Sequence, residues 1–176
     1  MHELLNRLFA YKAWADDALL TSLAGLGADN QVTTLAIKAL AHMHVVDRIF
    51  AAHLRRTPHA YASANLEHLP TLDALSADIR ANDRDYIDHV SRLDAAQLAE
   101  RIDFTFTDGA PGRMSREEML LHVIIHGVGH RGQVSALMLL NALPPASDGF
   151  TTYLHQAEAV ARGRMTNEAH SPRVAA

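Results

Sequence analysis

Apolar side chains recur at helical spacing along most of the chain, and they predict long amphipathic helices. A first helix is expected over residues 2–24, and it ends before Gly25. A second is expected from about Thr33 to Arg56, before Pro58, because the residue preceding a proline is disfavoured in the α region. A third spans about residues 72–93. The inner stripes of the first two helices are Leu4, Leu8, Tyr11, Ala15, Leu19 and Leu23, and then Leu35, Ala39, His42, Val46, Ile49 and His53.

Charged residues of both signs accompany the third helix, and their pattern indicates a solvated outer face. They are Asp78, Arg80, Asp83, Arg84, Asp85 and Asp88. A short helical turn is expected next, at residues 94–99.

The helical rhythm breaks at residues 101–115, where the pattern is typical of a β-hairpin. Ile102, Phe104 and Phe106 alternate with polar residues, which is the signature of a strand. Asp108-Gly109 and Pro111-Gly112 are pairs that favour turns. We therefore expect a small hairpin inserted between the third and fourth helices.

The fourth helix begins with a capping box, in which Ser115 and Glu118 satisfy each other's free backbone N–H groups. It is expected to run to about Asn141, although it contains Gly127, Gly129 and Gly132. Each glycine costs about 1 kcal/mol against alanine in a helix, so a close approach by another helix or subunit is the simplest reason for them. A short helix is expected at about 149–161.

These elements predict an all-α fold, a four-helix bundle with a hairpin insertion before the fourth helix and a short C-terminal helix. Residues 1–162 would form one domain and 163–176 a flexible tail. The chain of 176 residues has a net charge of −4 and lacks a basic stripe, so we expect no nucleic-acid binding. No apolar run is long enough for a membrane span, and cytoplasmic location is the default expectation.

Histidine is the one anomaly of composition, with 12 residues in a chain that has no cysteine. Three of them, His122, His126 and His130, are four residues apart and share the face of the fourth helix that carries Met119 and Val123. Imidazoles on an apolar face are costly unless something binds them, and histidine is the commonest metal ligand. The drift of about 40° per four residues prevents all three from reaching one ion. We therefore predict His126 and His130 as ligands and place His122 at the edge of the site.

The third ligand should come from the second helix. His42 is favoured because it shares a face with Leu35, Val46 and Ile49. His44 is turned away and is expected to be exposed or at an interface, and His53 could be an ordinary histidine of the last turn. Asp47 would give a site of two histidines and one carboxylate, but its phase relative to His42 makes it the weaker alternative.

Three segments of the chain resemble the DinB/YfiT-like (damage-inducible) metalloprotein family. They are Tyr11-Lys-Ala-Trp14-Ala-Asp-Asp, His42-Met-His-Val-Val-Asp47-Arg-Ile-Phe50, and His122-Val-Ile-Ile-His126-Gly-Val-Gly-His130-Arg-Gly-Gln133. The last is the most specific. Phe50 stands where tryptophan is usual, and Lys12 and Asp16 where asparagines are usual. These departures bear on the lining of a pocket and leave the triad intact.

The resemblance implies a four-helix bundle that holds a divalent metal, zinc or nickel, on His42, His126 and His130. It also implies a homodimer. Relatives include transferases and isomerases that use bacillithiol, mycothiol or glutathione, so a small-molecule substrate and a low-molecular-weight thiol are expected. Gln133 could orient a ligand, and Arg131 could instead meet a carboxylate such as Asp47. The alternatives are a non-catalytic metal-binding or stress-related dimer and, less favoured, a metal-free helical dimer.

Overall fold

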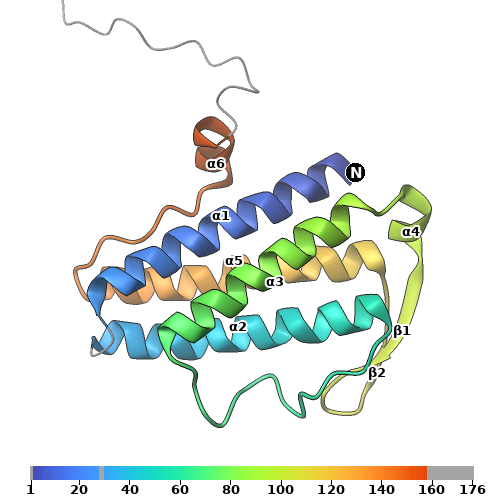
Figure 1. Cartoon of the computed structure of the whole chain (residues 1–176), viewed down its shortest axis with the longest axis horizontal. Helices are drawn as coiled ribbons and strands as arrows, with labels where there is room; N and C mark the ends of the chain where they lie inside the picture. Colours follow the sequence, from blue (N-terminus) through green and yellow to red (C-terminus); the bar gives the residue numbers. More distant parts are fainter. Residues whose placement is uncertain (1, 28–29, 158–176) are drawn as a thin grey trace, which may run out of the picture.

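Four long helices form the body of the molecule in the computed structural model, which describes residues 2–27 and 30–157 (Figure 1). They are α1 (His2–Leu26), α2 (Gln31–Arg55), α3 (Leu72–Ser91) and α5 (Arg116–Leu140). Helix α1 packs mainly on α3, and α2 packs mainly on α5, while α1 also contacts α5 and α2 contacts α3. The predicted bundle is confirmed, with its helix ends within about two residues of those expected.

The short elements also lie where the sequence predicts them. Helix α4 (Ala95–Ala99) leads into β1 (Arg101–Thr105), which pairs antiparallel with β2 (Pro111–Ser115). Gly109 takes the positive φ of +87° that the hairpin turn needs. Helix α6 (Phe150–Gln156) packs Tyr153 against Tyr11 and Trp14 of α1. The rest of the predicted C-terminal helix and the predicted tail lie outside the described residues.

Side-chain caps define the helix starts. Asn30 and Thr71 each accept a backbone N–H of the first turn of α2 and α3. Ser115 and Glu118 form the predicted capping box of α5, with distances of 3.1 and 2.6 Å. Helix α2 ends at a left-handed residue, Arg56, whose φ is 54°. Among the described residues, no helix is long and apolar enough to cross a membrane.

Two positions of the predicted inner stripes are wrong. Leu4 and Leu35, at the starts of their helices, are each 48% exposed. Two large clusters make up most of the apolar core, one around Phe9, Phe50 and Met119 and the other around Leu20, Leu40 and Val134. A smaller third cluster contains Tyr11, Ala15 and Tyr153. The space between the two large clusters is polar.

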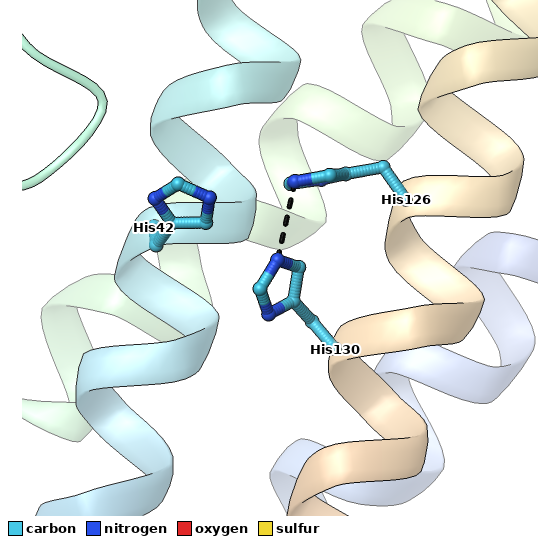
Figure 2. Close-up of side chains that lie close together, drawn as sticks. All are labelled: His42, His126 and His130. Atoms are coloured by element: carbon cyan, nitrogen blue, oxygen red, sulfur yellow. Dashed lines mark hydrogen bonds between the residues drawn. The ribbon is translucent and has the colours of Figure 1, made fainter.

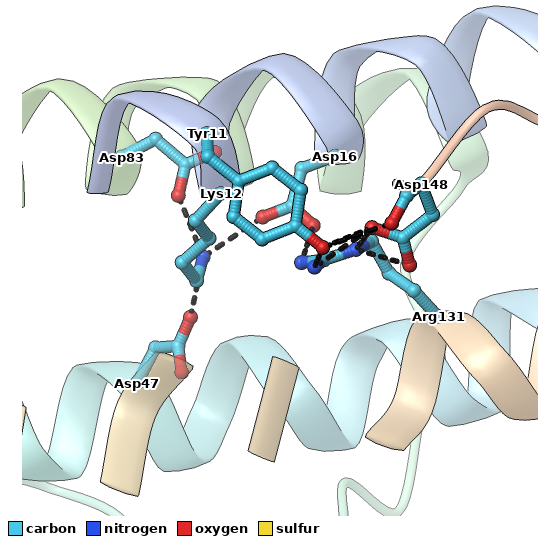
Figure 3. A network of polar contacts seen from close by, with 7 residues as sticks. All are labelled: Tyr11, Lys12, Asp16, Asp47, Asp83, Arg131 and Asp148. Carbon is cyan, nitrogen blue, oxygen red and sulfur yellow. Dashed lines mark hydrogen bonds and ion pairs between the residues drawn. The ribbon is translucent and has the colours of Figure 1, made fainter. Parts of the chain in front are cut away.

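A buried ammonium group occupies that space. The Nζ of Lys12 in α1 lies 2.8 Å from Asp16, 3.0 Å from Asp47 of α2 and 2.6 Å from Asp83 of α3 (Figure 3). All four side chains are at most 4% exposed. Burial alone would lower the pKa of Lys12, but the three carboxylates outweigh it and raise the pKa well above its usual value. Lys12 therefore stays charged in the core.

A second cation extends this network to α5. Arg131 donates to Asp16 at 2.9 Å and to both carboxylate oxygens of Asp148 at 3.1 Å, and it lies 3.4 Å from the hydroxyl of Tyr11. Tyr11 donates in turn to Asp148 at 2.7 Å. The network defined by Tyr11, Lys12, Asp16, Asp47, Asp83, Arg131 and Asp148 thus ties all four long helices and the segment before α6 together.

Carboxylates outnumber cations in the network, four to two. Burial raises the pKa of Asp83 to about 7 and that of Asp47 to about 6, against the opposing effect of Lys12. Burial would also raise the pKa of Asp16, but Lys12 and Arg131 hold it below its usual value. The network therefore gains protons from solution as the pH falls through neutrality.

Replacing the central cation tests how far the bundle depends on it. In Lys12→Met, three buried carboxylates lose their shared partner, and we expect the free energy of unfolding at pH 7 to fall by about 3–5 kcal/mol. The pKa values of Asp47 and Asp83, already raised, rise further in the folded variant, so its folded state binds more protons than the unfolded chain. Stability should therefore increase as the pH is lowered from about 8 toward 5. Urea denaturation at several pH values measures both effects.

The control is Lys38→Met, which removes the same charge from an exposed position. Its free energy of unfolding should change by less than about 0.5 kcal/mol. Equal losses in the two variants, or a loss in Lys12→Met that deepens at low pH, would contradict the role assigned to Lys12.

Candidate metal centre

The structure brings together the three histidines predicted as metal ligands. His42 points from α2 toward α5, where His126 and His130 lie one turn apart (Figure 2). One ring nitrogen from each lies within 4.8 Å of the others, and the Nε2 atoms of His126 and His130 are 3.1 Å apart. All three side chains are partly exposed, so the cluster can be reached from solvent. Their role as ligands stays a prediction, and the geometry suits it.

One backbone oxygen and one side-chain oxygen fix the tautomers of His42 and His130. Nδ1 of His42 lies 3.2 Å from the carbonyl oxygen of Ala64, and Nδ1 of His130 lies 2.9 Å from Oε1 of Gln133. Because these oxygens only accept hydrogen bonds, each Nδ1 must carry the proton. Nε2 of His42 and of His130 is therefore left with a lone pair. An oxygen partner behind a metal-binding imidazole is the usual arrangement in metal sites.

Electrostatics keep the pair on α5 neutral at neutral pH. Burial, with smaller contributions from His130, His122 and His42, lowers the pKa of His126 to about 4. Burial and the nearby His42 also lower the pKa of His130. Neutral imidazoles offer lone pairs, which is the protonation state that a metal ligand needs.

A cation fits this donor set. Because Nε2 of His130 has the lone pair, the 3.1 Å contact requires the proton on Nε2 of His126, and its buried Nδ1 has no hydrogen-bond partner within the described part of the chain. A cation between the rings would be bound by the Nε2 lone pairs of His126 and His130, with His126 in the tautomer that carries its proton on Nδ1. Tetrahedral zinc bonds of 2.0–2.1 Å put two ligand nitrogens about 3.3 Å apart, which is close to the distance observed.

The remaining histidines of the two helices lie outside the cluster. His122 stacks between Phe50 and His126, with ring centroids 4.5 and 5.5 Å away, which places it at the edge of the site as expected. His53 packs against Phe104, 4.7 Å away. His44 is half-buried rather than exposed, and burial lowers its pKa to about 4. Asp47, the alternative ligand, is bound to Lys12 instead.

Two cavities flank the cluster. One, of about 370 Å³, is lined by His42 and His130 with Lys38 and Asn65 among its other walls. The other, of about 360 Å³, is lined by His126 and His122 with side chains of α2 and of the hairpin. A ligand of the central cluster could therefore extend to either side of it.

The two candidate catalytic residues differ in their surroundings. Gln133 is exposed and contacts His130 directly. Arg131 is only 1% exposed, and its guanidinium is bound by Asp16 and Asp148 rather than by Asp47. Its side chain therefore belongs to the buried network behind the cluster.

Gly127 joins the cluster to that network. A Cβ at this position would lie 3.3 Å from Nη1 of Arg131 and 3.5 Å from Cε of Lys12. The close approach predicted for the glycines of α5 therefore applies to Gly127. At Gly129 and Gly132 a Cβ would point into open space, with no side chain beyond those of the adjacent residues within 4 Å in the part of the chain that the structure describes.

The sequence pattern does not predict the buried polar network. Asp83, assigned to a solvated face, is buried against Lys12, and Lys12 and Asp16 lie in the core rather than along a pocket. One signal for Asp83 was available, since it lies four residues after Ile79 and three before Tyr86, on the apolar face of α3. Asp148 precedes α6 without any pattern that would reveal its partner.

Comparison with known proteins supports the family resemblance of the three sequence segments. A family model described as DinB family matches residues 1–164. Neither the curated proteins nor the solved structures contain a significant match. The family match covers all the described helices, the hairpin and the three clustered histidines. The chain therefore belongs to the DinB family.

Proposed function

We propose that the chain holds a divalent metal ion, zinc or nickel, on His42, His126 and His130 and catalyses transfer or hydrolysis of a small molecule. The observation that carries the proposal is the convergence of three partly exposed ring nitrogens from two helices. Three protein ligands leave a position for water, a thiol or substrate, as in catalytic rather than structural zinc sites. A low-molecular-weight thiol is the cosubstrate proposed for that position.

The ion would supply Lewis-acid chemistry, which lowers the pKa of a bound water or thiol toward neutrality. The protein's part is to orient the imidazoles and to keep those of His126 and His130 neutral. Ala64 and Gln133 fix two of the rings through their Nδ1 protons. Gln133, on the exposed side of α5, is also the side chain best placed to donate through its amide nitrogen to a ligand there.

Assembly is part of the proposal, because α5 carries an apolar stripe on the side away from the bundle. Its members Leu121, Ile125, Val128 and Leu139 are 42–61% exposed. Gly132 lies among them with open space above it, which would let a second helix approach closely. We propose that this stripe, with Gly132, is where two copies of the chain form a homodimer.

Metal content tests the ligand assignment. The purified protein should hold about one equivalent of divalent metal, and His126→Ala should bind it at least about 100-fold more weakly. Gln133→Ala loses only the oxygen partner of His130, so a loss of about 10–100-fold is expected. His122→Ala, on the same helix face but outside the cluster, is the matched control and should keep its metal. Elemental analysis and competition with a chelator measure the series; equal affinities in all variants would refute it.

Cobalt substitution tests the thiol. Thiolate binding to a Co²⁺ form should add an intense near-ultraviolet charge-transfer band and deprotonate the thiol at neutral pH. Glutathione, bacillithiol and mycothiol are compared, each with an electrophilic substrate to detect turnover. No band and no turnover with any of them, in a protein that holds cobalt, would leave a non-catalytic metal-binding protein as the better description.

Sedimentation tests the dimer. The protein at micromolar concentration should sediment as twice its chain mass of 19.3 kDa. Ile125→Asp places a charge in the centre of the stripe and should give the monomer, whereas Leu69→Asp, at an exposed position of the α2–α3 connection, should not. A 19.3 kDa species of the unmodified chain would count against the proposal.

A further inference from the structure

The cavity on the hairpin side of the histidine cluster has walls that differ from those of its neighbour. Its volume is about 360 Å³, and His126 forms part of one wall. On the other side of the cluster, Lys38 lines the cavity of about 370 Å³ described above. A further cavity on that side, beside His42, is lined by Lys38 and Glu67. Around the hairpin-side cavity no lysine, arginine, aspartate or glutamate occurs among the lining side chains within the described residues. A charged group in this cavity would therefore find no lysine, arginine, aspartate or glutamate side chain to pair with among the described residues that line it.

Rings form a continuous wall that starts at the cluster. His126 stacks on His122, and His122 lies over Phe50 with centroids 4.5 Å apart. Phe50 in turn meets His53 edge to face, with ring centroids 6.0 Å apart. Aromatic rings of this kind pack well against other flat rings, which they contact by offset stacking or edge to face.

The hairpin supplies the outer wall. Phe106 and Met114 line the cavity from the two sides of the hairpin, and Phe106 is 43% exposed at its rim. Phe104 lies behind them, 4.8 Å from Phe106 and 4.7 Å from His53. Its ring lies directly over Gly112 of the paired strand, where a Cβ would come within 2.5 Å of it. Glycine at 112 therefore lets the Phe104 ring lie across the hairpin and support this wall.

From these observations we propose that the hairpin-side cavity is the binding site for an uncharged apolar group, preferably aromatic, of a substrate whose reacting end lies at the His42–His126–His130 cluster. The proposal rests on the function proposed above for that cluster. The volume of the hairpin-side cavity suits a single substituted ring. The charged cavities on the other side, near Lys38 and Glu67, would then take a more polar part of the reactants.

A first experiment needs no metal. Protein carrying methyl-¹³C methionine, without added metal, is titrated with benzyl alcohol and followed by NMR. The Met114 methyl resonance, assigned by its loss in Met114→Leu, should shift through the ring current of the bound probe. Met138, buried in the other core cluster, should not shift. Benzoate, the charged analogue, should bind at least about tenfold more weakly. No saturable shift at Met114, or equal binding of benzoate, overturns the proposal.

A second experiment joins the cavity to the cluster. Hydroxamates bind the cobalt form and alter its visible spectrum, and benzohydroxamate should bind about tenfold or more tightly than acetohydroxamate because its ring enters the cavity. Met114→Glu should abolish this preference by placing a carboxylate in the wall. Thr105→Glu adds the same charge at an exposed site on the same hairpin and should retain it. Phe106→Ala, which changes only the exposed rim, should weaken the preference without risk to folding.

The outcomes separate the two proposals. A protein that holds no cobalt refutes the metal function, while the methionine experiment still tests the cavity. A protein that binds cobalt and both hydroxamates with equal affinity keeps its metal site and loses the proposed aromatic site. The same preference in Met114→Glu and in the unmodified protein also overturns the cavity assignment.

Discussion

A single buried ammonium group sets the packing of this bundle. The Nζ of Lys12 lies between carboxylates of α1, α2 and α3, and through Asp16 it is linked to Arg131 of α5. Ion pairs of this kind add little net stability compared with apolar packing, but breaking one leaves a charge without a partner in the core. Each helix must therefore present its charged residue at the same level of the bundle. This requirement constrains the register of the helices more tightly than apolar contacts would, since apolar contacts tolerate small slips.

The register fixed in this way also positions the candidate metal centre. Residues 126–131 of α5 form fewer than two turns. His126 and His130 point toward α2 and Arg131 toward the network, and Gly127 lies against Lys12 and Arg131. Gly127 has no side chain at the point where Lys12 and Arg131 pass, so the backbone of α5 can lie close to the network. Asp47 lies five residues after His42 on the same helix and is bound to Lys12. The network thus holds both helices that carry the three histidines.

The sequence predicts the elements whose information is local. Apolar periodicity gives the four helices, turn pairs give the hairpin, and the i, i+4 spacing gives His126 and His130. It does not predict the network, because a buried charge differs from a solvated one only through its partner. The partner of Lys12 at Asp83 is 71 residues away, and that of Arg131 at Asp148 lies outside any predicted pattern. The predicted burial of Leu4 and Leu35 is wrong because the start of a helix can extend past the neighbouring helices that would cover it.

The same distinction explains why the sequence indicates a metal more clearly than a substrate. The proposed ligands lie on two regular helices. Because a helix repeats its faces, spacing alone brings His126 and His130 together, and the apolar face of the second helix favours His42. The wall of the hairpin-side cavity combines α2, the hairpin and α5, three segments whose relative placement no repeat encodes. Its aromatic side chains Phe50 and Phe106, with Phe104 behind them, each have an ordinary place in a strand or helix pattern. Only their convergence beside His126 distinguishes them from core residues, and that convergence depends on how the hairpin folds back over α2.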